Sequence, residues 1–144
     1  ISSMGGKIYS PMEAWYHATK HALEGWSDCL RFELKPFNID VIIIEPGLID
    51  TGVGEVVMRA ALERSGQGPY KEMVQALVRN SENSNGGINP SPPSVIANTI
   101  SKAIKAHRPK TRYAVGTMAK PSIFMRKWFG DRFFDMVLER MISN

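Results

Sequence analysis

Tyr16 and Lys20 are the residues of this sequence whose types and spacing best suit proton transfer. Four positions apart on a helix, two side chains lie on one face, with their Cβ atoms roughly 6 Å apart. A free tyrosine has a pKa of about 10, too high for a base near neutral pH. A neighbouring ammonium stabilises the phenolate, so the pair could take or give a proton under physiological conditions. Because Y-x-x-x-K also occurs on ordinary solvated helices, the interpretation depends on what surrounds it.

Two other segments could bring polar groups to the same place. Ser3 ends a short segment, residues 1–3, that reads as the end of a strand, and its hydroxyl could hydrogen-bond a substrate oxygen. The β-branched run at 39–44 predicts a strand buried on both faces, and the sequence P-G-L-I-D-T at 46–51 follows it directly. Ligands of open α/β sheets bind at the carboxyl ends of strands, so we expect both segments to lie at a ligand-binding edge.

The element that must position Tyr16 and Lys20 is a long helix, which we expect over residues 10–36. Ser10 suits the N-cap, and Glu13 completes an S-x-x-E capping box. Pro36 ends the helix because proline lacks an N–H and clashes with the preceding turn.

The rest of the chain alternates helix-like and strand-like segments. Helix-like runs are expected at 55–64, at 70–79, from Ser94 to Pro109 and from Lys120 on with a break at Gly130, and a short strand is expected at 112–116. This alternation predicts an α/β fold with a parallel sheet. Two complete parallel strands should not stand alone. We therefore expect residues 1–144 to form one partial domain whose first half is absent.

Together, Ser3, the Y-x-x-x-K of Tyr16 and Lys20, and the P-G-x-x-x-T at 46–51 resemble the catalytic half of the short-chain dehydrogenase/reductase family. The resemblance implies the C-terminal half of a doubly wound, parallel-sheet Rossmann-type domain. The glycine-rich phosphate-binding turn of that family is absent from this sequence, so the N-terminal cofactor-binding half is expected to be missing and the 144 residues alone to be inactive. Thr19 stands where the family more often has serine before the lysine, which removes no role.

By this resemblance, the protein transfers a hydride between NAD or NADP and an alcohol or carbonyl substrate. Tyr16 would be the general acid/base, Lys20 would assist it and hold the nicotinamide ribose, and Ser3 would polarise the substrate carbonyl. The residues implied to contact the cofactor are Tyr16, Lys20, Pro46, Gly47, Ile49 and Thr51. Residues 47–90 would cover the substrate, and their apolar content favours a hydrophobic alcohol or ketone. Residues 118–144 would form a C-terminal helical segment.

Composition and charge limit the other classes of function. Hydrophobic residues make up 43% and charged residues 22% of the chain, which is typical of a globular protein. The single cysteine, Cys29, cannot form an internal disulfide, so we expect a cytoplasmic protein and a core role for this side chain. His17 and His21 share helical spacing but have no further ligands, so we predict no metal site and a helix-surface position for His17.

The positive charge is concentrated at the C-terminal end. Residues 100–144 carry ten basic and three acidic side chains, interleaved with aromatic residues at helical spacing. Such a helix usually packs on its own protein or on a second subunit, so a homo-oligomer is favoured, a membrane surface is the less favoured partner, and no nucleic-acid partner is expected.

Three alternatives remain open at this point. The chain could be an inert fragment, a scaffold or binding protein on the same fold, or a relative in the epimerase/dehydratase branch that shares Y-x-x-x-K. Retention of Ser3, Tyr16 and Lys20 together speaks against decay, and Pro46-Gly47 speaks against the epimerase branch.

Overall fold

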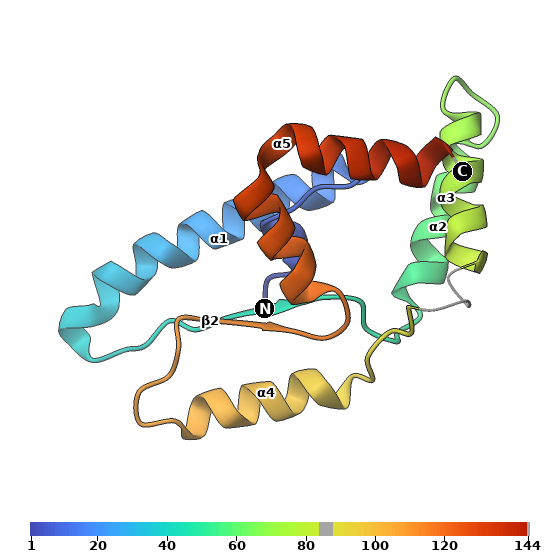
Figure 1. Ribbon diagram of the computed structural model, residues 1–144. Helices are drawn as coiled ribbons and strands as arrows, with labels where there is room; N and C mark the ends of the chain where they lie inside the picture. Colours follow the sequence, from blue (N-terminus) through green and yellow to red (C-terminus); the bar gives the residue numbers. More distant parts are fainter. Residues whose placement is uncertain (84–87, 144) are drawn as a thin grey trace.

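The sheet of this protein consists of two short parallel strands in the computed structural model, which describes residues 1–83 and 88–143. Strands β1 (Ile43–Pro46) and β2 (Arg112–Val115) pair in register, with Ile43 opposite Arg112. Helix α4 runs along one face of the sheet, and α1 and α5 lie on the opposite side (Figure 1). A parallel sheet between helical layers confirms the predicted α/β class.

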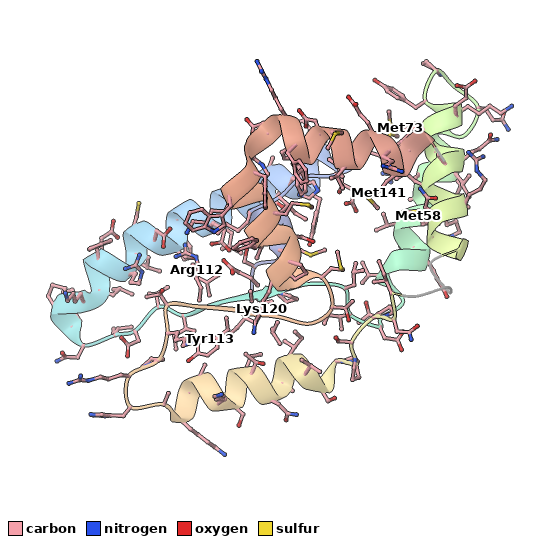
Figure 2. The ribbon with its side chains drawn as sticks, viewed as in Figure 1. Met58, Met73, Arg112, Tyr113, Lys120 and Met141 are labelled. Carbon is pink, nitrogen blue, oxygen red and sulfur yellow. The ribbon has the colours of Figure 1, made fainter. Side chains whose placement is uncertain are left out.

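The helices surround this sheet and extend beyond it. Their bounds are η1 (Met4–Gly6), α1 (Ala14–Leu34), η2 (Lys35–Phe37), α2 (Val53–Ser65), α3 (Lys71–Asn83), α4 (Ser94–Lys105) and α5 (Ala119–Ser143), where η marks a 3-10 turn. Helices α2 and α3 form a hairpin that projects away from the strands and meets the C-terminal half of α5, where Met58, Met73 and Met141 gather (Figure 2). The segment 47–90 is thus largely helical, and its residues 84–87 lie outside the described part.

Helix α1 begins at Ala14, so the predicted start at Ser10 and the predicted capping box are wrong. Met12 has φ +66°, in the left-handed region that a right-handed helix cannot include. The Ser10 hydroxyl donates to Glu13 Oε2 at 2.6 Å instead of accepting from the backbone of the first helical turn. At the other end the helix stops at Leu34, and Pro36 lies within η2, in agreement with its predicted role as a terminator.

Strand β1 lies later in the chain than the predicted run at 39–44. Its buried residues are Ile43, Ile44 and Glu45, and Pro46 still pairs with Val115. The length and position of β1 follow from its partner, since only four residues of β2 are available for pairing. On the other edge of β1, the Ser2 N–H donates to Ile44 O at 2.8 Å, which places the N-terminal segment beside β1.

Helix α1 buries polar rather than apolar side chains. Its buried residues are His17, Glu24 and Ser27, whereas Trp15 is 87% exposed and Cys29 is exposed, so the predicted core role of Cys29 is wrong. Leu23, Leu30 and Leu34 of this helix are half-buried, so the fully buried contacts of α1 are hydrogen bonds and ion pairs.

Arg112 is the centre of the largest group of ion pairs among the described residues. Its Nε lies 3.2 Å from Glu24 Oε2 and 3.2 Å from Glu45 Oε1, and its Nη2 lies 2.6 Å from Asp28 Oδ2. Lys7 Nζ adds a contact of 3.0 Å to Glu24 Oε2. Arg112 lies on the α1 side of β2, and its neighbour Tyr113 lies on the α4 side, as expected for successive strand residues (Figure 2). The cluster therefore connects α1, both strands and the residue after η1.

The pKa values of two carboxyl groups in this cluster, Asp28 and Glu45, are shifted in opposite directions. The hydrogen bond from Arg112 holds the pKa of Asp28 below its usual range, although burial opposes the shift. Burial and the neighbouring Glu24 raise the pKa of Glu45. Arg31 Nη2 also lies 3.0 Å from Asp28 Oδ1, so the cluster contains three carboxyl groups and three cations.

Gly130 divides α5 into two legs. Its φ of +74° and ψ of −173° interrupt the helix, as the sequence predicted. The first leg follows β2 closely, and the second leg turns towards the α2–α3 hairpin (Figure 1). In the part of the chain that the structure describes, no helix combines the length and hydropathy needed to cross a bilayer.

Replacing Arg112 with methionine should lower the free energy of unfolding of the full-length protein by about 3 kcal/mol near neutral pH, because buried carboxylates lose their counter-ion. The lowered pKa of Asp28 contributes stability above its unfolded pKa, and this contribution is lost as the pH falls through the folded pKa. The difference between variant and wild type should therefore shrink below about pH 4. Urea unfolding of the variant and the wild type at several pH values measures this difference in stability.

Lys110→Met is the matched control, since Lys110 is an exposed cation two residues away. It should change stability by less than about 0.5 kcal/mol. An equal loss in both variants, or a loss for Arg112→Met that is constant with pH, would contradict the assignment of Arg112 as the counter-ion.

Candidate active site

Ser3 is the N-cap of the turn η1, which packs closely against α1. Its Oγ accepts a hydrogen bond of 3.0 Å from the Gly5 N–H. Gly5 and Gly6 are buried, and a Cβ atom at Gly6 would come within 2.8 Å of Glu24 Cγ and 3.0 Å of Lys20 O. At Gly5, a Cβ atom would come within 3.0 Å of Tyr16 Cε1. The two glycines thus let the turn that carries Ser3 approach the face of α1 that carries Tyr16 and Lys20.

Tyr16 and Lys20 lie together on α1, as their spacing predicted. Lys20 Nζ lies 5.8 Å from the centre of the Tyr16 ring. Tyr16 is 43% exposed, which leaves its phenol accessible to a ligand. Lys20 Nζ also donates a long hydrogen bond of 3.5 Å to Ile1 O. The ammonium is therefore held between the tyrosine ring and the chain just before Ser3.

The segment 46–51 forms a network of backbone hydrogen bonds at the end of β1. The N–H groups of Gly47 and Leu48 donate to Val115 O and Thr117 O, both at 2.8 Å, and the Asp50 N–H donates to Ser91 O at 2.9 Å. A Cβ atom at Gly47 would lie 2.1 Å from Thr117 O and 2.7 Å from Ala119 N. Only glycine fits here, because the chain after β2 passes directly against this residue.

The predicted site residues fall into two groups at one end of β1. Ser3, Tyr16 and Lys20 form the first group, and Pro46, Gly47, Ile49 and Thr51 belong to the second. Ser2 is hydrogen-bonded to Ile44, so the turn of Ser3 leaves β1 on the same side as Pro46. Thr51 is exposed and Ile49 is half-buried, which leaves the second group open to a ligand.

His17 is a site residue that the sequence analysis placed wrongly, since it is buried and not on the helix surface. Its side chain contacts Gly5 O and the backbone N–H of Ser10, and its ring packs edge-on against Tyr16 at 5.5 Å. A signal was present in the sequence: His17, Lys20, Glu24 and Ser27 form a polar stripe at spacings of three and four. This stripe is the face by which α1 contacts the rest of the molecule.

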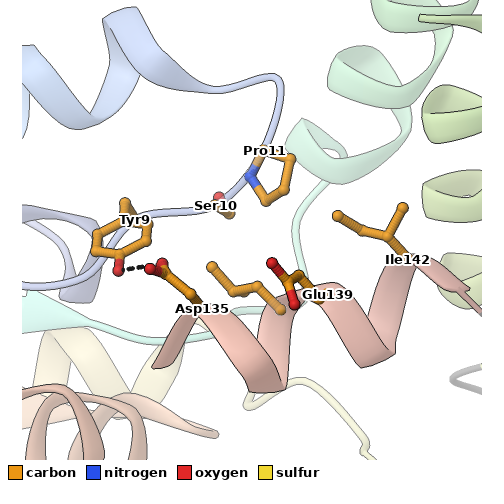
Figure 3. A pocket seen from close by; sticks show the side chains of 7 residues that line it. Tyr9, Ser10, Pro11, Asp135, Glu139 and Ile142 are labelled. Atoms are coloured by element: carbon orange, nitrogen blue, oxygen red, sulfur yellow. Dashed lines mark hydrogen bonds between the residues drawn. The ribbon is translucent and has the colours of Figure 1, made fainter. Parts of the chain in front are cut away.

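A pocket of about 280 Å³ is lined in part by Ser10, which contacts the His17 ring (Figure 3). Residues 9–11, which lead into α1, form one wall, and the second leg of α5 forms the other. Its lining residues are Tyr9, Ser10, Pro11, Asp135, Leu138, Glu139 and Ile142. The Tyr9 hydroxyl donates to Asp135 Oδ1 at 2.6 Å and so connects the two walls. This bond also raises the pKa of the Tyr9 phenol, because the neutral phenol donates to the Asp135 carboxylate.

Among the described side chains, those of residues 1–81 and 88–142, no group of three or more His, Cys, Asp or Glu is arranged to hold a metal ion.

Comparison with known proteins places this site in a wider context. A family model described as short chain dehydrogenase matches residues 1–61. The chain is 29% identical over 148 aligned residues to the uncharacterized oxidoreductase YusZ of Bacillus subtilis, covering 99% of this chain and 51% of that protein. It is 32% identical to the probable short-chain type dehydrogenase/reductase VdlC of Helicobacter pylori, covering 97% of this chain and 52% of VdlC.

A third relative is similar over a shorter stretch. A 3-ketodihydrosphingosine reductase of Bacteroides thetaiotaomicron is 44% identical over 52 residues, which is 36% of this chain and 19% of that enzyme. The chain spans about half the length of the first and second of these relatives, YusZ and VdlC.

Gly47→Ala should lower the free energy of unfolding by roughly 2–3 kcal/mol, because the new methyl group must displace the backbone at Thr117 and Ala119. Gly54→Ala is the matched control. Gly54 lies within α2 with open space around its Cβ position, so alanine there should raise stability by about 0.5–1 kcal/mol. Thermal and urea unfolding of both variants measure the difference, and two shifts of the same sign would be inconsistent with the close approach at Gly47.

Proposed function

Because the chain belongs to the short-chain dehydrogenase/reductase family, we propose that it carries the catalytic residues of a nicotinamide-dependent oxidoreductase acting on an alcohol or a ketone. The observation that carries the proposal is the geometry around Tyr16. Its accessible phenol lies beside the Lys20 ammonium and against the turn that carries the Ser3 hydroxyl. A proton donor, a neighbouring cation and a second hydroxyl in one place suit chemistry at a carbonyl oxygen.

In this proposal Tyr16 exchanges a proton with the substrate oxygen. In reduction its hydroxyl gives the proton to the forming alkoxide, and in oxidation its phenolate accepts the alcohol proton. Ser3 Oγ accepts from Gly5 N–H, so its own O–H remains able to donate to the substrate oxygen. The bound nicotinamide supplies or accepts the hydride.

Lys20 acts on both the tyrosine and the cofactor. Its positive charge stabilises a phenolate at Tyr16, 5.8 Å from the ring centre. Among the described residues, Lys20 Nζ donates one hydrogen bond, the 3.5 Å contact to Ile1 O, and an ammonium has three donors. Lys20 can therefore also donate to the hydroxyls of the nicotinamide ribose.

The segment 46–51 fits the nicotinamide side of the cofactor. Pro46 and Gly47 fix the direction in which the chain leaves β1, Ile49 offers backbone groups, and the exposed Thr51 offers a hydroxyl. These donors and acceptors suit a carboxamide, and they are common to NAD and NADP. We assign the pyrophosphate and the adenosine to a dinucleotide-binding half outside residues 1–144.

The substrate proposed for this site is a hydrophobic alcohol or ketone. Support comes from the pocket beside Ser10, whose α5 wall includes Leu138 and Ile142. The similarity to a 3-ketodihydrosphingosine reductase favours the same class of ligand, a ketone on an apolar chain. Part of the segment 47–90, with the α2–α3 hairpin, would cover it.

Tyr16→Phe should reduce kcat of the full-length enzyme by about 10²–10⁴, because the ring remains but no proton can be exchanged. The dissociation constant of the cofactor should stay within about threefold, since the contacts of Lys20 remain. Tyr113→Phe removes a hydroxyl that accepts from Lys110 N–H on the α4 side of the sheet, opposite α1, and should leave kcat within about twofold. Steady-state assays with NADH and NADPH against apolar ketones measure both, and more than a tenth of wild-type kcat in Tyr16→Phe would refute the proposed role.

Lys20→Met should weaken cofactor binding by roughly ten- to a hundredfold and also lower kcat, because charged hydrogen bonds contribute about 1.5–3 kcal/mol each. Lys35 is an exposed lysine after the end of the same helix. Lys35→Met is therefore the control and should change neither the cofactor affinity nor kcat. Isothermal titration calorimetry with NAD and NADP measures binding. Unchanged cofactor affinity and unchanged kcat in Lys20→Met would contradict the proposed role of Lys20 in binding and catalysis.

A further inference from the structure

The two ring nitrogens of His17 each make a hydrogen bond beside the proposed site, one as a donor and the other as an acceptor. Its Nδ1 lies 2.8 Å from Gly5 O, and its Nε2 lies 2.9 Å from the Ser10 backbone nitrogen. A carbonyl oxygen can only accept and a backbone N–H can only donate. These two contacts assign the ring proton to Nδ1 and the lone pair of Nε2 to the Ser10 N–H.

The two contacts reach two different parts of the site. Gly5 is the residue whose N–H binds Ser3 Oγ, so the Nδ1 contact fixes the turn that carries Ser3. Ser10 lines the pocket of about 280 Å³, so the Nε2 contact fixes the pocket wall. Both contacts originate from the residue next to Tyr16, on the same rigid helix.

The surroundings of His17 leave it little freedom. The residue is 7% exposed, and a Cβ atom at Gly5 would come within 3.2 Å of its ring. On the Nε2 side, the Ser10 hydroxyl lies 2.8 Å away and itself donates to Glu13 Oε2 at 2.6 Å. Loss of the imidazole would leave the Gly5 carbonyl and the Ser10 N–H without these partners, at a partly buried position.

We propose that His17 is a positioning residue that sets Ser3 and the pocket wall relative to Tyr16 through the Nδ1–Gly5 and Nε2–Ser10 hydrogen bonds. The inference rests on the proposed function, because it assigns Ser3 to the reaction and the pocket to the substrate. His17 exchanges no proton with the substrate, since both of its nitrogens are engaged by the backbone.

The two hydrogen bonds can be separated by substitution. Asparagine places an amide N–H near the Nδ1 position, so His17→Asn retains the bond to Gly5 O and loses the acceptor for Ser10. Glutamine places an amide oxygen near the Nε2 position, so His17→Gln retains the acceptor for Ser10 and loses the donor to Gly5. His17→Leu removes both.

In the full-length enzyme, His17→Gln should lower kcat by roughly 10–100-fold with KM for the ketone little changed, because the Ser3 hydroxyl is displaced from the reacting oxygen. His17→Asn should raise KM by roughly tenfold with kcat nearly retained, because a loosened pocket wall binds substrate and transition state equally poorly. His17→Leu should show both defects. His21→Leu, on the exposed side of the next turn, should leave both constants within about twofold of wild type.

Nitrogen-15 NMR of labelled histidine provides a readout that does not depend on turnover. The His17 signal, identified by its loss in His17→Gln, should show a protonated Nδ1 and an unprotonated Nε2 near neutral pH. Equal kinetic effects of asparagine and glutamine, wild-type kinetics in His17→Leu, or a proton on Nε2 would each overturn the inference. Wild-type enzyme inactive on all ketones and alcohols would refute the proposed function instead, and the NMR result would then decide the His17 contacts alone.

Discussion

The attachment of α1 by directional polar contacts is the constraint on which the rest of this structure depends. An apolar helix face tolerates small rotations about the helix axis, whereas hydrogen bonds weaken steeply when their angles change. His17 holds the start of α1 to the loop at residues 5–10, and Glu24 and Asp28 hold its middle to Arg112. Tyr16 and Lys20 lie beside or between these contacts, so their direction relative to the sheet is fixed.

The same arrangement explains which parts of the site could be predicted from the sequence. The pairing of Tyr16 with Lys20 follows from helical spacing alone, and the break at Gly130 follows from its residue type. The start of α1 could not be predicted, because Met12 adopts a left-handed conformation that its residue type does not favour. The burial of His17 does not follow from the spacing of apolar residues, because the residues that this helix buries are polar.

The predicted bounds of the first strand are wrong for a different reason. The β-branched run at 39–44 has the composition of a strand, but pairing within the described residues is limited by β2, which has four residues. Composition reports where a strand is favoured, and hydrogen bonding to a neighbour decides where it forms. Glu45, a charged residue at a fully buried strand position, is accommodated because Arg112 lies in the opposite strand two positions away in register.

Gly130 has a consequence for residues it does not touch. Its backbone conformation, φ +74° and ψ −173°, is open essentially only to glycine, so the angle between the two legs of α5 is set by a single missing side chain. The second leg supplies the pocket wall from Asp135 to Ile142. The dimensions of the pocket therefore depend on a position outside its lining, and a change at residue 130 would alter the size of the pocket without altering any residue that lines it.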